Sequence, residues 1–368
     1  MTRELAYAIA LGAPLLGGVL LPALAMRALV PALERSTIRV ANYRGASLPV
    51  GLGIVWVVWV LGLLTASTAV TAWRALAPEG GGAGELLYSG YLSVALGSVP
   101  ALLTLAAFAL GAFDDVFGTS AEKGFSGHVS ALLGGRLTTG MLKLLGIGLA
   151  SLIAGLTRTT GWRVWSADGP LSAGWGTFIA TWLGSALVIA LTANLVNLLD
   201  LRPGRALKGY LALVLPAVLL VPAGIRVVID PQLASLGAAA LTPLDQGVLT
   251  VALALVFFGP VLAVWGFDLG ERAMLGDAGS NAAGAVAGWL YALVLPPTGL
   301  GIAALLLLVA NLASERVSFS AVIERITLLR WLDGLGRRAD APGKAASEPH
   351  SAGESRYDAE ESRDDREA

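Results

Sequence analysis

The sequence predicts an all-α, polytopic integral membrane helix bundle with about nine transmembrane helices. Of its 368 residues, 55% are hydrophobic and only 14% are charged, whereas a typical soluble domain has about 25% charged residues. The apolar residues also gather into runs of roughly 20, the length that crosses a hydrocarbon core about 30 Å thick. Because backbone polar groups in that core must be satisfied internally, each run is expected to be a helix.

Nine runs are long and apolar enough to be spans, and together they predict one bundle over residues 1–314. They cover residues 5–30, 48–73, 87–112, 138–157, 174–198, 206–228, 243–266, 279–296 and 298–314. The first run is too long for a signal-peptide core and lacks a clear cleavage site, so we expect it to be retained. The sequence Pro296-Pro297-Thr298-Gly299 indicates a tight turn between the last two spans.

The basic residues of the loops predict the orientation. On one side the loops hold sixteen Lys and Arg residues, and on the other, which includes the N-terminus, they hold five. Loops rich in Lys and Arg stay in the cytoplasm. The N-terminus is therefore expected outside and the C-terminus in the cytoplasm.

Two segments follow the bundle. Residues 315–338 alternate apolar residues with arginines in a roughly helical pattern, which predicts an amphipathic basic helix on the cytoplasmic membrane surface. Residues 339–368 carry nine acids and four bases. That composition cannot bury a core and predicts a disordered acidic tail.

The content of cysteine and histidine limits the kinds of site. With no cysteines and two histidines, the chain has neither disulfides nor thiolate or histidine metal clusters. The net charge of −1 and the hydrophobic composition give no reason to expect a nucleic-acid partner. Oxygen ligands from Asp and Asn remain as the candidate site chemistry.

Three polar clusters interrupt the apolar sequence, and all three fall on the predicted cytoplasmic side. The first is Asp114-Asp115, at the end of the third span. Carboxylates at the edge of the hydrocarbon are costly and indicate function. Adjacent residues on a helix lie about 100° apart, so one carboxylate could bind a cation such as Mg²⁺ while the other takes a proton. The alternative is a solvated loop after the span.

The second cluster lies at the end of the fifth span. Asn194, Asn197 and Asp200 are spaced by three residues and share one arc of the helix. Buried amides need partners, and they could either join neighbouring helices or bind a ligand. Asn197 and Asp200 lie nearer the water and are the better ligand candidates.

The third cluster, Gly276-Asp277-Ala278-Gly279-Ser280, precedes the small-residue helix of the eighth span. Ser280 is a candidate N-cap, and the free N–H groups of a helix N-terminus suit phosphate. Asp277 beside them could hold a metal ion that bridges the phosphate. The alternative is a Gly-rich turn. Further on, Gly284 and Gly288 are interpreted as packing residues.

Together these clusters resemble the motifs of the polyprenyl-phosphate N-acetylhexosamine-1-phosphate transferase superfamily (glycosyltransferase family 4). Its members include the phospho-N-acetylmuramoyl-pentapeptide transferase of peptidoglycan synthesis. The resemblance covers about residues 38–314. It is carried by DDxxG at residues 114–118, NxxNLxD at 194–200 and MxGDxGS at 274–280.

Other residues support the resemblance. Asn42-Tyr-Arg-Gly45 followed by Pro49-x-Gly51-x-Gly53 looks like the start of the family's second span. Lys123 and Lys143 stand where the family has basic residues after its aspartate pair.

The resemblance implies transfer of a sugar-1-phosphate from a UDP-sugar to a membrane polyprenyl phosphate in cell-envelope synthesis. It implies Mg²⁺, with Mn²⁺ as an alternative, and the cytoplasmic face of a bacterial inner membrane, with a homodimer as a further partner arrangement. The implied roles of the residues are as follows: Asp277 binds the metal; Asp114, Asp115 and Asp200 are catalytic; and Asn194, Asn197, Lys123, Lys143, Gly279 and Ser280 bind substrate.

The sequence departs from the family pattern at the end that would recognise uridine. Leu201 and Pro203 replace a glycine and an aspartate, and Met274 stands where close relatives have a stacking aromatic residue. The histidine-rich motif of the last cytoplasmic loop and a tenth span are absent from the sequence, and the arginines of residues 315–338 are candidates to replace the histidines. The departures leave open altered donor recognition or an inactive paralogue that binds polyprenyl lipid or envelope-assembly partners. A transporter is disfavoured because no predicted span carries a charge near its middle.

Overall fold

The computed structural model describes residues 3–76, 97–118, 124–161, 174–235 and 242–337. The described chain is mostly helical. Lys123, the first part of the predicted third span and the predicted acidic tail lie outside the described residues.

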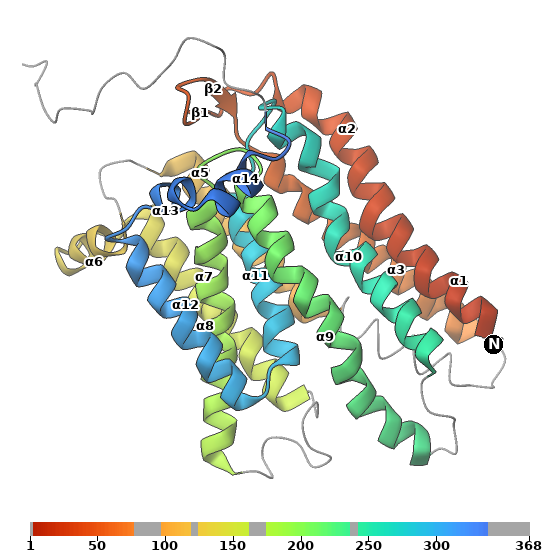
Figure 1. Ribbon diagram of the computed structural model, residues 1–368. Coiled ribbons are helices and arrows are strands. Elements are labelled where there is room, and N and C mark those ends of the chain that lie inside the picture. The colour runs from red at the N-terminus through yellow and green to blue at the C-terminus, as the bar shows by residue number, and fades with distance from the viewer. Residues whose placement is uncertain (1–2, 77–96, 119–123, 162–173, 236–241, 338–368) are drawn as a thin grey trace, which may run out of the picture. The chain divides into compact units, whose positions relative to one another are not determined.

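The helices and strands follow one another along the chain as shown in Figure 1. The helices are α1 (Arg3–Ala13), the π-helix η1 (Pro14–Leu20), α2 (Leu21–Leu33), the 3₁₀ helix η2 (Leu52–Ile54), α3 (Val55–Leu76), α5 (Ser98–Phe117), α6 (Gly124–Leu133), α7 (Thr139–Gly161), α8 (Trp175–Leu199), α9 (Arg205–Ser235), α10 (Pro243–Leu269), α11 (Gly276–Val294), α12 (Pro297–Ser314), α13 (Phe319–Arg325) and α14 (Thr327–Gly334). The strands are β1 (Arg39–Ala41) and β2 (Ser47–Pro49).

Each of the nine predicted spans overlaps a helix or a run of helices within the described residues. Among the described residues, seven segments are long and apolar enough to cross a membrane, so the prediction of a helical membrane bundle is confirmed. These seven lie in α1–α2, η2–α3, α5, α7, α8, α10 and α12. The helices α9 and α11 account for the other two predicted spans, and the number nine stays a prediction.

The second span begins later than predicted. Residues 39–49 form an antiparallel hairpin in which Arg39 pairs with Pro49 and Ala41 with Ser47. Helix α3 begins only at Val55. The sequence resemblance had placed the start of a span here, but the turn at Asn42–Gly45 reverses the chain: the Asn42 side chain accepts from the N–H groups of Arg44 and Ala46.

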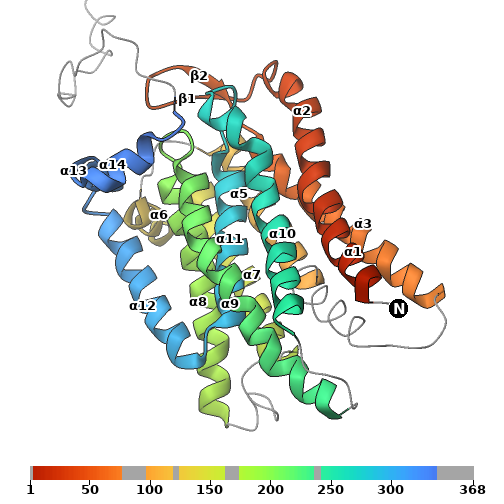
Figure 2. The same cartoon turned by 45° about the vertical axis from the view of Figure 1, so that its right-hand side comes forward.

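Helix α11 occupies the centre of the bundle (Figure 2). All but two of its residues are buried, and it packs against α5, α8 and α9. Its glycines permit close contact with α8: a Cβ atom added to Gly284 would lie 2.5 Å from the Ala193 Cα, and one on Gly288 would lie 2.6 Å from the Ile189 Cα. The prediction that these two glycines serve packing is confirmed.

Buried aromatic side chains join α3, α9 and α10. The Trp59 indole donates to the Val256 carbonyl at 2.7 Å, and the Tyr210 hydroxyl donates to the Phe257 carbonyl at 2.9 Å. Trp56 packs edge-on against both Trp59 and Tyr210. Polar atoms buried this deeply usually need hydrogen-bond partners, and backbone carbonyls supply them for Trp59 and Tyr210, whereas the Trp56 indole nitrogen has no partner among the described residues.

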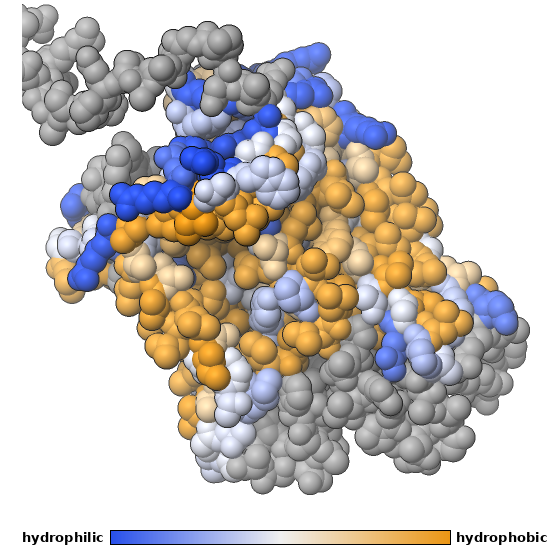
Figure 3. Space-filling view, viewed as in Figure 1, coloured by the Kyte–Doolittle hydropathy of each residue, from blue (hydrophilic) through white to orange (hydrophobic). Residues whose placement is uncertain are grey.

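The polar clusters lie at one end of the helices. The hairpin, α13 and α14 lie at this end, whereas the N-terminus lies at the opposite end (Figure 1). Hydrophilic residues gather around α13, α14 and the hairpin, and hydrophobic residues cover the helix flanks below them (Figure 3). We call this end the polar end.

The predicted single helix over residues 315–338 is instead two short helices. Helix α13 ends at Arg325 and α14 begins at Thr327, because Ile326 adopts an extended conformation (φ −94°, ψ 112°). The break lets Asp333 turn toward the bundle. Its side chain is 6% exposed.

Asp333 fastens α14 to the start of α9. The Arg205 guanidinium donates to both Asp333 carboxylate oxygens, at 2.9 and 3.0 Å. Arg337 pairs with the same carboxylate at 3.0 Å, and Lys208 donates to the Asp333 carbonyl at 2.6 Å. Burial alone would raise the pKa of Asp333, but the hydrogen bonds and charge of Arg205 outweigh it and hold that pKa below its usual value.

We predict that Gly284→Ala destabilises the bundle by about 1–3 kcal/mol, because the added methyl group meets α8 backbone and overpacks the core. The matched control is Gly148→Ala on α7, where a Cβ atom meets nothing within 4 Å. Thermal unfolding in detergent should show a lower Tm for Gly284→Ala only. Equal Tm values for the two variants would contradict the close α8–α11 packing.

We also predict that Asp333→Asn lowers the free energy of unfolding by about 3 kcal/mol at pH 7, because Arg205 loses its buried partner. The Tm of the variant should fall accordingly. A carboxylate whose pKa is lowered in the folded state stabilises above its unfolded pKa of about 3.9, and that contribution is lost as the pH falls through the folded pKa. The Tm difference between wild type and variant should therefore shrink below about pH 4. A difference that stays constant down to pH 2 would rule out this ion pair as its source.

Candidate functional site

Three charged side chains from three helices meet at the polar end. Lys143, in the second turn of α7, donates to the Asp114 carboxylate of α5 at 2.7 Å and also to the Asp277 carboxylate of α11. The lysine is buried, with 7% of its surface exposed. A buried ammonium needs a counter-charge, and two carboxylates supply it here. We call Asp114, Lys143 and Asp277 the charged triad.

Asp115 has a different role from its neighbour. Its two carboxylate oxygens accept the backbone N–H groups of Asp277 and Ala278, each at 2.9 Å. The first N–H groups of a helix have no partner within the helix, and the N-cap of α11, Leu275, supplies no side-chain bond. A carboxylate from α5 therefore caps α11.

Glycines let the chain approach closely around this cap. A Cβ atom on Gly111 of α5 would lie 2.3 Å from the Asp277 carbonyl oxygen, and one on Gly53 would lie 2.5 Å from the Gly279 nitrogen. Gly276 has a φ of +73°, which favours glycine. Gly279 thus packs against the Leu275 side chain and the Gly53 backbone rather than facing an open ligand space.

Met274, just before α11, is hydrogen-bonded to the backbone at the end of the hairpin. The Met274 N–H donates to the Pro49 carbonyl at 2.8 Å, and the Met274 carbonyl accepts from Gly51 and Leu52 at 3.2 and 3.1 Å. These three bonds fix where α11 begins.

The second cluster contacts α11 and α12. The Ser280 hydroxyl lies 2.8 Å from the Asn197 amide oxygen and 2.9 Å from the Gly276 carbonyl. Ser280 is fully buried inside α11, so the interpretation of Ser280 as the N-cap is wrong. The helix begins four residues earlier because Asp115 supplies the cap.

Asn194 joins two helices. Its amide donates to Asn311 of α12 at 2.6 Å, and Asn311 donates in turn to the Leu191 and Leu307 carbonyls. Of the two interpretations left open for Asn194, this geometry favours the joining of helices.

Asp200 ends α8 and lies near a second carboxylate. Burial, and then the charge of Asp268, raises the pKa of Asp200 well above its ordinary value. Asp268 accepts the Gly204 N–H at 2.6 Å and thereby holds the turn that follows Asp200. A protonated carboxyl at Asp200 could donate a hydrogen bond, whereas an ionised one accepts only.

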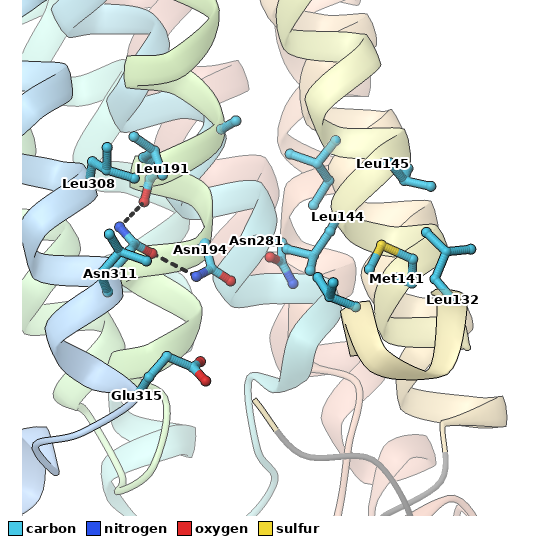
Figure 4. A pocket seen from close by; sticks show the side chains of 14 residues that line it. Leu132, Met141, Leu144, Leu145, Leu191, Asn194, Asn281, Leu308, Asn311 and Glu315 are labelled. Atoms are coloured by element: carbon cyan, nitrogen blue, oxygen red, sulfur yellow. Dashed lines mark hydrogen bonds between the residues drawn. The ribbon is translucent and has the colours of Figure 1, made fainter. Parts of the chain in front are cut away.

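An apolar groove of about 470 Å³ lies beside the charged triad. Figure 4 shows Asn311, Leu191 and Leu308 on one side, Met141 and Leu144 on the other, and Asn281 between them. The full lining comprises Val129, Leu132, Met141, Leu144, Leu145, Ile147, Ala190, Leu191, Asn194, Asn281, Leu308, Asn311, Leu312 and Glu315.

The groove and the triad share two helices. Asn281 donates to the carbonyl of Asp277, one turn earlier on α11, at 2.7 Å. On α7, the groove residues Met141 and Leu144 flank Lys143 in the sequence. The groove and the charged triad are therefore joined through α7 and through the Asn281–Asp277 contact on α11.

The structure brings some predicted site residues together and separates others. Asp114, Lys143 and Asp277 form direct ion pairs, Asp115 binds the backbone beside Asp277, and Asn197 is linked to Ser280. Within the described part of the chain, Asp200 forms no ion pair with the triad, and it is the charge of Asp277 that acts on it.

Sequence reasoning missed several polar residues, namely Asn281, Asn311, Asp268, Arg205 and Asp333. The only available signal was the presence of a lone amide or carboxylate within or beside an apolar run.

Whether the charged triad can hold a magnesium ion depends on its oxygen ligands. Among the described residues, no group of three or more His, Asp or Glu side chains is placed to hold a metal ion. Mg²⁺ is, however, usually bound by one or two carboxylates together with substrate phosphates. Asp114 and Asp277 supply two carboxylates that Lys143 already holds together, so the donor set fits, and a metal ion there would compete with the ammonium.

Comparison with known proteins adds no identification. No family model matches the chain, and no curated protein matches it. The candidate site therefore rests on its own geometry and on the motif resemblance.

We predict that Asp115→Asn weakens the first turn of α11, because the amide nitrogen would face backbone N–H donors and leave one of them unpaired, at a cost of about 1–3 kcal/mol. Hydrogen exchange of the amides of Asp277 and Ala278 should speed up. Asp114→Asn is the matched control, since Asp114 does not bind these amides. Similar protection in the two variants would show that Asp115 is not the cap.

Proposed function

We propose that the chain is a Mg²⁺-dependent phosphoglycosyl transferase of a bacterial cytoplasmic membrane. It would transfer a sugar-1-phosphate from a UDP-sugar to a polyprenyl phosphate, in the synthesis of peptidoglycan precursors or another cell-envelope polysaccharide. The observation that carries the proposal is the junction of the apolar groove with the charged triad.

The groove suits the lipid substrate. A polyprenyl phosphate has a long apolar tail and an anionic head, and it reaches its enzyme from the membrane. A tail in the groove between α7 and α12 would place its phosphate near Asn281 and Lys143. Lys143 could then contact the phosphate, since an ammonium is a compact point charge with three donors.

The triad suits the reaction. Joining two phosphate-bearing substrates requires neutralisation of their charge, and phosphoryl transfer depends mostly on positioning and electrostatics. In the proposal, Asp277 and Asp114 hold Mg²⁺, which would neutralise charge on the phosphates. Asp115 positions Asp277 by capping α11. Asp200 would accept the proton of the polyprenyl phosphate or, with Asn197 and Ser280, contact the nucleotide-sugar.

A second candidate function is a polyprenyl-lipid-binding protein without transferase activity. The space bounded by Asn42, Tyr43, Asp200 and Met274, next to the residues that differ from the family at the uridine end, measures only about 10 Å³. Lys143 also bridges the two carboxylates that a metal ion would use. These two observations favour lipid binding over turnover.

The test is UMP release in detergent from a panel of UDP-sugars with polyprenyl phosphate, with and without Mg²⁺. A transferase should release UMP only with Mg²⁺. Asp277→Asn should lower the rate by at least about 100-fold, the usual effect of losing one preorganised electrostatic group. Glu34→Gln, an equivalent change at an exposed carboxylate, should retain the wild-type rate.

Three outcomes separate the two functions. UMP release that Asp277→Asn abolishes supports the transferase. Binding of polyprenyl phosphate without UMP release from any donor supports the lipid-binding protein. Absence of both activity and binding would contradict both functions.

A further inference from the structure

Helix α14 and its C-cap residue, Leu335, carry an apolar stripe that nothing in the described part of the chain covers. Leu328, Trp331, Leu332 and Leu335 follow the i, i+3, i+4, i+7 spacing of one helix face. Their exposed fractions are 63%, 60%, 41% and 42%. Asp333 lies well away from this stripe around the helix and is buried against α9. Helix α14 is therefore held by its polar side and presents its apolar side outward.

The stripe continues a surface that already faces lipid. On α12, which is long and apolar enough to span a membrane, Leu305, Val309 and Leu312 are 61%, 57% and 53% exposed. Beyond its end, Val317 is 48% exposed, and α13 and α14 follow. The chain thus passes from the exposed apolar side of a helix able to span a membrane to the exposed stripe at the polar end.

In residues 315–337 the acidic side chains face the protein, and several of the basic side chains face outward. Glu315 accepts from Ser126, Glu324 pairs with Arg202, and Asp333 pairs with Arg205 and Arg337. Arg316, Arg325 and Arg330 are exposed, and no ion pair joins them to any described residue. Three exposed positive charges are left on the segment that carries the stripe, and Arg330 lies on the opposite side of α14 from it.

We propose that α13 and α14 form a docking surface for anionic phospholipid headgroups of the membrane that the bundle spans. The apolar stripe would enter the headgroup boundary, and Arg316, Arg325 and Arg330 would bind lipid phosphates. Short helices with Leu and Trp on one face and arginines beside them bind membranes in this way. The inference does not depend on the proposed transferase activity.

The docking surface is attached to the candidate site by two ion pairs. Glu324 of α13 binds Arg202 in the turn that follows Asp200, and Asp333 of α14 binds Arg205 at the start of α9. Lipid contact would therefore hold the turn that ends the second polar cluster.

Because the chain has no cysteine, a thiol-reactive fluorophore can report on one chosen position of the full chain. We would label Leu328→Cys on the stripe and, as the matched control, Gly334→Cys, which lies about 120° around α14 from Leu328 and where a Cβ atom meets nothing within 4 Å. Both variants would be reconstituted in phosphatidylcholine vesicles with and without phosphatidylglycerol. Quenching by aqueous iodide measures the exposure of each label to water.

The proposal predicts that the label at position 328 is protected from iodide relative to the label at position 334, and more so with phosphatidylglycerol. Replacing Arg316, Arg325 and Arg330 by Gln should weaken the anionic-lipid effect by about fivefold per arginine, the equivalent of about 1 kcal/mol for each basic residue at an anionic surface. Circular dichroism would confirm that each variant keeps its helices.

Two outcomes would overturn the proposal. The two labels could be equally exposed, or protection at position 328 could be the same in neutral and anionic vesicles. The second result would mean that something other than anionic headgroups, such as a second copy of the chain, covers the stripe.

Discussion

The candidate site depends on how the N-terminus of α11 is held. This helix starts inside the bundle, where its first N–H groups cannot reach water, and Asp115 of α5 accepts two of them. The same contact fixes the position of Asp277, since its N–H is one of the two. The close approach of α5 to α11 requires Gly111, and the backbone bonds of Met274 fix the chain just before the helix.

Asp114 and Asp115 are adjacent in the sequence but have different roles: Asp114 belongs to the charged triad, and Asp115 caps α11. Because neighbouring side chains on a helix point about 100° apart, Asp115 faces the start of α11 while Asp114 faces Lys143 on α7. Lys143 then links Asp114 to Asp277. Helices α5, α7 and α11 are thereby joined through side chains at one end of the bundle, where an anionic substrate would meet the Lys143 ammonium beside two carboxylates.

Much of the fold could be predicted from the sequence, because in hydrocarbon an apolar run of about 20 residues has little choice but to be a helix. The site was predictable only in part. The aspartates and Lys143 were found from their position at span ends and from motif resemblance, but spacing could not reveal that Lys143 would bridge carboxylates from two other helices. The cap of α11 could not be predicted, because a serine at the start of a helix is a usual N-cap and Ser280 fits that pattern. The residue that caps α11 is Asp115, 162 residues before Asp277 in the sequence. Likewise, the break at Ile326 accompanies the buried contacts of Asp333 with Arg205 of α9, and the local sequence does not reveal such contacts between distant residues.

The junction of groove and triad constrains function more than any single residue does. An isolated Lys–Asp cluster at a helix end could be a structural clamp, and an isolated apolar groove on a membrane helix could simply hold lipid. Here α7 and α11 contribute to both: Met141 and Leu144 line the groove and flank Lys143, and Asn281 connects the groove wall to Asp277. A molecule that fits both parts must be apolar over most of its length and charged at one end. Transferase activity and lipid binding alike satisfy that requirement, so they differ only in whether a nucleotide-sugar can enter beside Asp200 and Met274.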